Sequence, residues 1–173
     1  MTIFVLRHGD AVENPALHDS ERPLSEAGRR QGVTAGRYLR SLNVSINLIL
    51  VSPLVRAQQM AAAVKQEIGE VSASTTEYLE ASSDPRQIVE HLSSLNVSNL
   101  LLVGHEPHLS KTISLLISGS GTPCVEMKKG SLACLDLPAP VERGKAILRW
   151  LITTQQMQSA VGPTDSARSF SPT

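Results

Sequence analysis

The sequence has no net charge, no long apolar run and no cysteine motif, and these absences exclude several classes of protein. Sixteen basic residues are balanced by sixteen acidic ones. The chain therefore has no overall electrostatic field that would favour nucleic acid or an anionic membrane as a partner. Any site for an anion must be a local cluster of basic side chains.

No apolar stretch approaches the length that a membrane-spanning helix needs. The apolar run that begins at Thr2 is too short for a signal peptide, and no basic segment precedes it. Cys124 and Cys134 lie ten positions apart, without C-x-x-C spacing or a histidine at metal-ligand distance. We therefore expect free, partly buried thiols and a reducing cytoplasmic location.

What the sequence does contain is an alternation of β-prone runs with helical segments. Its 173 residues, 41% hydrophobic and 18% charged, suit one globular domain. Strands are expected at 2–7, 47–53, 99–103, 124–127, 131–137 and 146–153, and helices at 25–42, 54–68, 84–95 and 108–118. This order predicts an α/β fold of three layers, with a mostly parallel sheet, an antiparallel edge and helices on both faces.

Composition also suggests how the chain is divided and how its first helix packs. Glycines at 28, 32 and 36 fall on one side of that helix and are expected to let it lie close against a sheet. From residue 155 the chain is poor in apolar residues and rich in Ser, Thr and Pro. We expect residues 1–154 to form the domain and 155–173 to be a disordered tail. A monomer is the default expectation.

Reactive or anion-binding side chains follow three of the expected strands. The first strand ends in Arg7 and His8, the second leads into Arg56 at a helix start, and the third ends beside His105. In open α/β sheets, ligands bind at the carboxyl ends of the strands. If these strands are parallel neighbours, their arginines and histidines converge on one small volume.

Such a cluster has a specific chemical use. Guanidinium groups and imidazoles that lie together repel one another unless an anion lies between them. The planar fork of arginine matches phosphate oxygens, and a helix start near Arg56 adds backbone N–H groups. One histidine can attack phosphorus, and the other, protonated, can neutralise charge in the transition state. The pattern therefore predicts a phosphoryl-transfer site that works without a metal.

Each residue taken alone has a plainer interpretation. Arg7 could be an ordinary strand-end residue, Arg56 a solvated helix residue, and His105 a core histidine bonded to the backbone. The coincidence of the same chemistry at separate strand ends favours a functional site instead. No catalytic role is expected for the histidines that lack this context: His18, His91 and His108.

Three motifs give the chain a clear family resemblance. They are L-R-H-G at 6–9, S-P-x-x-R-A at 52–57 and G-H-E-P at 104–107, and R-P-L-S-E-x-G at 22–28 extends the match. In this order they resemble the signatures of the histidine phosphatase superfamily, which has the phosphoglycerate-mutase-like fold. The resemblance covers roughly residues 1 to 150. The compact length, together with the R-H-G-D-A segment at 7–11 and R-P-L-S-E-x-G at 22–28, makes the chain most similar to the SixA-like phosphohistidine phosphatases.

The resemblance implies roles for individual residues. It makes His8 the nucleophile, which would be phosphorylated in a covalent intermediate that water then hydrolyses. Arg7, Arg56 and His105 would bind the phosphoryl oxygens, and Arg22 would be a further basic residue near the phosphate pocket. No metal or other cofactor is implied.

A general acid is harder to place. Larger relatives use a glutamate in the loop before the second histidine, and the corresponding loop here is 78–85. Asp84 is better explained as a helix cap, which leaves Glu80 as the nearest candidate acid. Asp10 and Glu106 also lie near the site in sequence, where either could orient an arginine.

The missing acid and the short loops bear on the substrate. A phosphoramidate releases an imidazole that needs little help from an acid, and an open pocket suits a side chain on another protein. We therefore expect a phosphohistidine on a protein, such as a histidine-containing phosphotransfer domain, as substrate. The alternatives are a metal-independent phosphatase of small phosphate monoesters, with Glu80 as acid, and a non-catalytic phosphoprotein-binding module. Neither nucleic acid nor a membrane is an expected partner.

Overall fold

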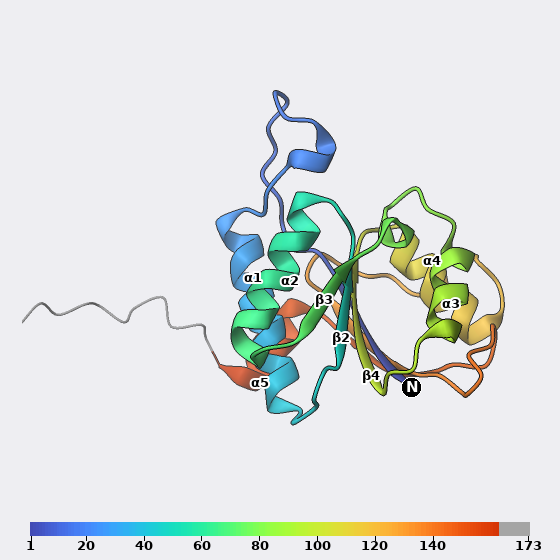
Figure 1. Cartoon of the computed structure of the whole chain (residues 1–173). Coiled ribbons are helices and arrows are strands. Elements are labelled where there is room, and N and C mark those ends of the chain that lie inside the picture. The colour runs from blue at the N-terminus through green and yellow to red at the C-terminus, as the bar shows by residue number, and fades with distance from the viewer. Residues whose placement is uncertain (163–173) are drawn as a thin grey trace, which may run out of the picture.

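The computed structural model describes residues 1–162, and these form one six-stranded sheet between two layers of helices (Figure 1). The strands are β1 (Thr2–Arg7), β2 (Leu48–Val51), β3 (Ser72–Thr75), β4 (Asn99–Gly104), β5 (Leu132–Asp136) and β6 (Ile147–Ile152). The helices are α1 (Glu26–Ser41), α2 (Val55–Ile68), α3 (Pro85–Ser94), α4 (His108–Ser118) and α5 (Thr154–Val161). Two short 3₁₀ helices are η1 (Asp19–Glu21) and η2 (Glu77–Leu79).

The strand order is β3-β2-β4-β1-β5-β6. The first four strands are parallel, and β5 and β6 add an antiparallel edge. Helices α1, α2 and α5 cover one face, while α3 and α4 cover the other (Figure 1). The predicted three-layer α/β fold is therefore confirmed.

Alternating side chains of β1 fill the two cores. Ile3 and Val5 belong to the core under α3 and α4, and Phe4 and Leu6 belong to the core under α1 and α2. All four are at most 2% exposed. A strand buried on both faces reads as an unbroken apolar run, which is why 2–6 signals a central strand. Within residues 1–162, no helix has both the length and the apolar character needed to cross a bilayer.

Local signals placed the helix starts correctly. Ser25 accepts a hydrogen bond from the Gly28 amide, and Asp84 accepts one from the Arg86 amide with Pro85 in the first turn. These are side-chain caps for amide groups that have no partner inside the helix. Cys124 and Cys134 are free thiols, as predicted.

Three local expectations were wrong. Residues 124–127 form no strand, and the exposed residues of β3 form an edge strand that their polar composition concealed. Residues 155–161, expected to be part of the disordered tail, instead belong to α5, because Thr153 caps the helix and Met157 is fully buried against the sheet face that α1 covers. The remainder of the expected disordered tail, from residue 163, lies outside the described residues.

Two of the three glycines of α1 face another helix rather than the sheet. A methyl group built on Gly32 would lie 2.8 Å from Cβ of Ala63, and one on Gly36 would lie 2.7 Å from Cβ of Glu67, both in α2. These glycines therefore let two helices pack closely side by side, which corrects the expectation of a helix-to-sheet contact.

Gly28 has the tightest surroundings, and Gly28→Ala is expected to destabilise the protein by about 3 kcal/mol. The added Cβ would lie 2.0 Å from the backbone oxygen of Asp10, and backbone cannot move as a flexible side chain can. The gain in helix propensity, about 1 kcal/mol, is smaller than this clash. Chemical denaturation measures the effect. Gly121→Ala is the matched control, because nothing lies within 4 Å of that position, and equal stability of the two variants would contradict the account.

Candidate functional site

The topology brings the two predicted histidines together at the carboxyl edge of the sheet. β1 and β4 are parallel neighbours in a register that pairs Arg7 with Gly104. The amide of His8 donates to the Gly104 carbonyl at 3.0 Å, so His8 and His105 leave the sheet side by side. Their ring centroids are 4.9 Å apart, and both rings are buried.

The hydrogen bonds of His8 define its tautomer. Its Nδ1 lies 2.7 Å from the Gly9 carbonyl oxygen, which can only accept, so Nδ1 carries the proton. Nε2 then keeps its lone pair, and it accepts a hydrogen bond from Nε of Arg56 at 3.3 Å. The unprotonated nitrogen of His8 therefore points at the predicted anion-binding arginine.

Burial keeps both imidazoles neutral. Burial lowers the pKa of His8 to about 4, assisted by the charges of Arg56, Arg7 and Lys129 and opposed by its bond to Gly9. Burial also lowers the pKa of His105 to about 3, assisted by His8 and Arg56. Nε2 of His105 lies 2.8 Å from Oγ of Ser52, and its buried Nδ1 has no partner.

Arg56 is held by Asp19, a residue that the sequence analysis did not identify as part of the site. Arg56 is 7% exposed, and its Nη1 donates to the Asp19 backbone oxygen at 2.6 Å. Its Nη2 donates to Oδ2 of Asp19 at 2.9 Å. This pairing lowers the pKa of the Asp19 carboxyl. Asp19 lies in η1, and no local motif connects it with a residue 37 positions further along the chain.

Arg7 lies at the edge of the same cluster. Its Nη1 donates to the Met127 carbonyl at 2.7 Å, and its buried Nε has no protein partner. A buried guanidinium nitrogen without a partner is costly, and an anion could satisfy it. The structure therefore brings Arg7, Arg56, His8 and His105 to one edge of the sheet, as the sequence predicted.

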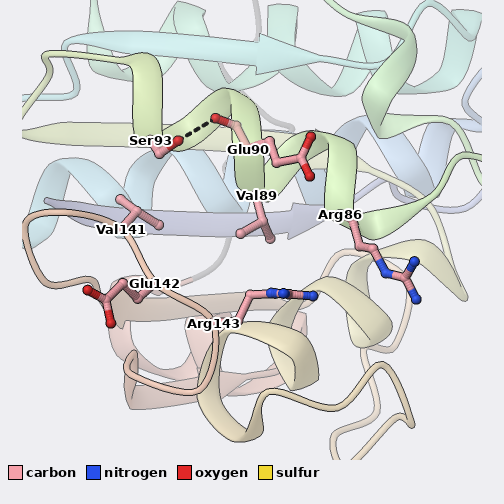
Figure 2. A pocket seen from close by; sticks show the side chains of 7 residues that line it. All are labelled: Arg86, Val89, Glu90, Ser93, Val141, Glu142 and Arg143. Carbon is pink, nitrogen blue, oxygen red and sulfur yellow. Dashed lines mark hydrogen bonds between the residues drawn. The ribbon is translucent and has the colours of Figure 1, made fainter.

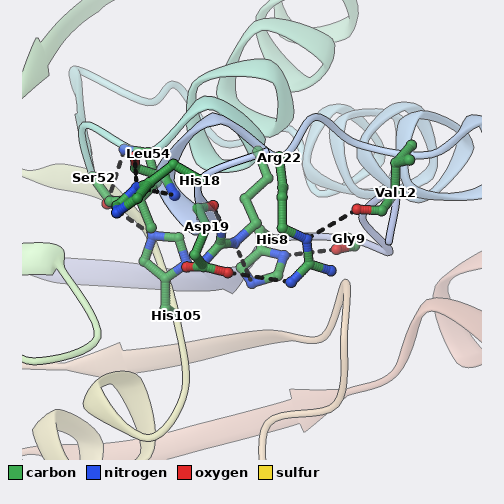
Figure 3. A network of polar contacts seen from close by, with 11 residues as sticks. His8, Gly9, Val12, His18, Asp19, Arg22, Ser52, Leu54 and His105 are labelled. Carbon is green, nitrogen blue, oxygen red and sulfur yellow. Dashed lines mark hydrogen bonds and ion pairs between the residues drawn. The ribbon is translucent and has the colours of Figure 1, made fainter. Parts of the chain in front are cut away.

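The two weaker candidates are arranged differently. Arg22 donates through Nε to the Val12 carbonyl at 2.9 Å and pairs through Nη1 with Asp19 at 3.2 Å, so it is linked to the cluster through Asp19 (Figure 3). Glu80 directly follows η2, and its carboxylate forms no hydrogen bond or ion pair with any described residue.

The two carboxylates expected to orient arginines do something else. Asp10 pairs with Nζ of Lys129 at 2.7 Å and accepts from Oγ of Ser25 at 2.9 Å. Glu106 accepts bonds from the amide and hydroxyl of Ser110 in the first turn of α4. Neither carboxylate pairs with an arginine among residues 1–162, so that expectation was wrong.

A groove elsewhere on the surface contains no comparable cluster of histidines and arginines. A groove between α3 and the loop before β6 is lined by Arg86, Val89, Glu90, Ser93, Val141, Glu142 and Arg143 (Figure 2). Its charged side chains are exposed and of both signs, and it shares no residue with the histidine–arginine cluster. Among the described residues, no three His, Cys, Asp or Glu side chains gather as ligands for a metal ion.

Comparison with known proteins gives consistent similarities. A family model described as the histidine phosphatase superfamily (branch 1) matches residues 3–81. Phosphohistidine phosphatase SixA of Escherichia coli is 27% identical, with 92% of this chain and 98% of that protein covered. A SixA homolog of Haemophilus influenzae is 32% identical, with 67% and 77% covered. A solved structure of SixA in complex with tungstate superposes with a TM-score of 0.83 at 27% identity, covering 91% of this chain and 99% of that one.

Proposed function

The chain belongs to the histidine phosphatase superfamily, and we propose that it is a phosphohistidine phosphatase that acts on another protein. Membership makes it a phosphatase, and the proposal concerns its substrate and the roles of its residues. The observation that carries the proposal is the geometry of His8. Its Nε2 is unprotonated, faces Nε of Arg56 and belongs to a ring that stays neutral at physiological pH.

In the first step Nε2 of His8 attacks the phosphorus of the substrate in line, and the bond from phosphorus to the leaving nitrogen breaks. Because Nδ1 keeps its proton on the Gly9 carbonyl, the phosphorylated ring is an imidazolium. In the second step water attacks phosphorus, and His8 leaves as a neutral imidazole. The electron pair of the broken bond stays on Nε2, and the protons of the water remain with the released phosphate.

The phosphoryl oxygens are bound by the surrounding cations. Arg56 and Arg7 have N–H groups beyond those that bond to protein atoms. His105 offers an unpartnered Nδ1, and an anion at its ring would favour the protonated form. Binding a phosphoryl group therefore satisfies buried donors that otherwise have no partner. Arg22, which pairs with Asp19, is proposed to support Arg56 indirectly.

The available proton donors favour a phosphoramidate over an ester. Lys129 lowers the pKa of Asp10 and Arg56 lowers that of Asp19, so both carboxylates near the site are ionised at neutral pH. An ionised carboxylate cannot protonate an alkoxide leaving group, and Glu80 has no hydrogen bond to the cluster. The imidazole that leaves a phosphohistidine needs no such donor when its other nitrogen carries a proton.

The surroundings of the cluster are open enough for a protein substrate. A shallow hollow beside Asp19 and Arg22 is bordered by Glu13, Asn14, Pro15 and Leu17. Leu17 and the nearby Val12 are exposed large apolar residues, the kind of surface that a partner protein can cover. A SixA relative is named for phosphohistidine, which agrees with this choice. A cytoplasmic location is part of the proposal, because the thiols of Cys124 and Cys134 are free.

Phosphate release from two kinds of substrate tests the proposal. The purified full chain is expected to hydrolyse a phosphohistidine protein with a kcat/KM about 10²-fold or more above that for phosphomonoesters, because a general acid contributes at least that factor to ester cleavage. Reactions contain EDTA. Faster ester turnover would replace the proposal with a metabolite phosphatase. Binding of the phosphoprotein without turnover would indicate a non-catalytic module.

A further inference from the structure

The turn between α4 and β5 is bonded to the candidate nucleophile and its neighbour. Arg7 donates from its side chain to the Met127 carbonyl at 2.7 Å and from its amide to the Ser131 carbonyl at 3.1 Å. The Gly130 amide donates to the His8 carbonyl at 3.1 Å. Residues 127–131 are thus held at both ends against the strand end that presents His8.

This turn places a lysine beside the cluster. Nζ of Lys129 lies 2.7 Å from Oδ1 of Asp10, two residues after His8, and the other Asp10 oxygen accepts from Ser25. The side chains of Lys129 and Asp10 are 45% and 41% exposed. The ammonium is close enough to contribute to the lowered pKa of His8. Lys129 therefore lies at the solvent side of the site, oriented by a carboxylate.

We propose that Lys129 is a substrate-binding residue, whose ammonium moves from Asp10 to an oxygen of the phosphoryl group bound at His8. The inference rests on the proposed function and extends it, because the sequence motifs include Arg7, His8, Arg56 and His105 but no residue of the 127–131 turn. Asp10 holds the ammonium near the site until substrate arrives.

The energetics of the pair permit this movement. An exposed lysine–carboxylate pair contributes only about 0 to 1 kcal/mol, so leaving Asp10 costs little. A phosphoryl group carries more negative charge than a carboxylate and lies among partly desolvated cations, where a charge-assisted hydrogen bond is stronger. The lysine stem is long and flexible, and the ammonium has three N–H donors with which to bond an oxygen of the phosphoryl group.

Substitution at two adjacent lysines tests the inference. Lys128 is exposed and lies in the same turn, and its side chain has no hydrogen bond or ion pair with any described residue, so Lys128→Met is the matched control for Lys129→Met. The measurements are the dissociation constant of tungstate, a tetrahedral phosphate mimic, by calorimetry, and kcat and KM for phosphohistidine. Lys129→Met is expected to weaken tungstate binding about tenfold and to lower kcat/KM by a similar factor. Lys128→Met should match the wild type, and Lys129→Arg should recover most of the binding.

Two different outcomes distinguish a failure of the inference about Lys129 from a failure of the proposed function. Tungstate binding by Lys129→Met within twofold of the wild type, with only a lower melting temperature, would overturn the inference and leave Lys129 as half of a surface ion pair. The proposed function would survive that result. A wild-type protein that binds no tungstate and releases no phosphate would overturn the proposed function itself, and the inference with it.

Discussion

His8→Ala is expected to lower phosphate release by at least about 10³-fold, the largest effect of any single substitution. The lone pair of His8 Nε2 faces Arg56, the arginine proposed to bind phosphate. Nε2 is unprotonated because Nδ1 carries the ring proton and donates it to the Gly9 carbonyl. Alanine removes the nucleophile, and water would have to attack the substrate directly. The measurement is initial-rate kinetics with a phosphohistidine protein at saturating concentration.

The control is a histidine outside the cluster. His91 lies in α3 and contacts the ring of Tyr78, with centroids 5.7 Å apart, so His91→Ala should retain activity within about threefold of the wild type. Circular dichroism and melting temperature establish that both variants are folded. Residual turnover by folded His8→Ala above about one tenth of the wild-type rate would rule out a covalent mechanism through this residue.

The second large effect is a loss of stability in mild acid. Burial lowers the pKa of His8 and His108 from 6.5 to about 4 and that of His105 to about 3. These groups are neutral in the folded chain but take up protons in the unfolded chain below pH 6.5. Their contribution to stability is therefore complete above pH 6.5 and is lost as the pH falls toward the folded-state values.

The expected slope follows from proton linkage. As the pH falls from the unfolded-state pKa of a histidine toward its folded-state pKa, that histidine lowers the free energy of unfolding by about 1.4 kcal/mol per pH unit. The three histidines together lower it by about 4 kcal/mol per pH unit. Because the lowered pKa values of Asp10, Asp19 and Asp136 start from 3.8, these carboxylates contribute mainly below pH 4. Urea denaturation at half-unit steps from pH 7 to pH 5 measures the slope.

A variant of His108 isolates one contribution. His108 is 1% exposed, and neither of its ring nitrogens has a partner among the described residues, so His108→Leu removes a titrating group without breaking a hydrogen bond. The slope between pH 6.5 and 5 is expected to fall by about one third. Stability that is independent of pH between 7 and 5 in the wild type would contradict the neutral, buried state of all three rings.

The main residues of this site were predictable because they directly follow strands that the sequence pattern identifies. Apolar runs of 2–6 and 99–103 marked the two central strands, and the parallel register of β1 and β4 then places His8 beside His105. Arg56 follows β2, the next parallel neighbour of β4. Buried strands can be recognised from local runs of apolar residues, and the site follows from the rule that ligands bind at the carboxyl ends of parallel strands. Both kinds of information can be obtained from a single sequence.

The partners of these residues were not predictable, because they depend on how separate loops meet. Asp19 and Arg56 are 37 positions apart, and Lys129 and Asp10 are 119 positions apart. Sequence alone placed Asp10 near an arginine and overlooked Asp19, which holds one. α5 was missed because its only fully buried side chain is Met157, so its apolar face is too short to stand out from a polar segment. The glycines of α1 indicated a close approach, but not which surface approached.

Identification of the phosphorylated atom tests the central claim most directly. The wild-type chain is mixed with a phosphohistidine protein, quenched in alkali within milliseconds, which preserves phosphohistidine, and analysed by peptide mass spectrometry. The account predicts phosphate on His8, attached through Nε2, that appears before free phosphate and disappears as turnover ends. Turnover with no phosphorylated enzyme, or with phosphate on a residue other than His8, would contradict it.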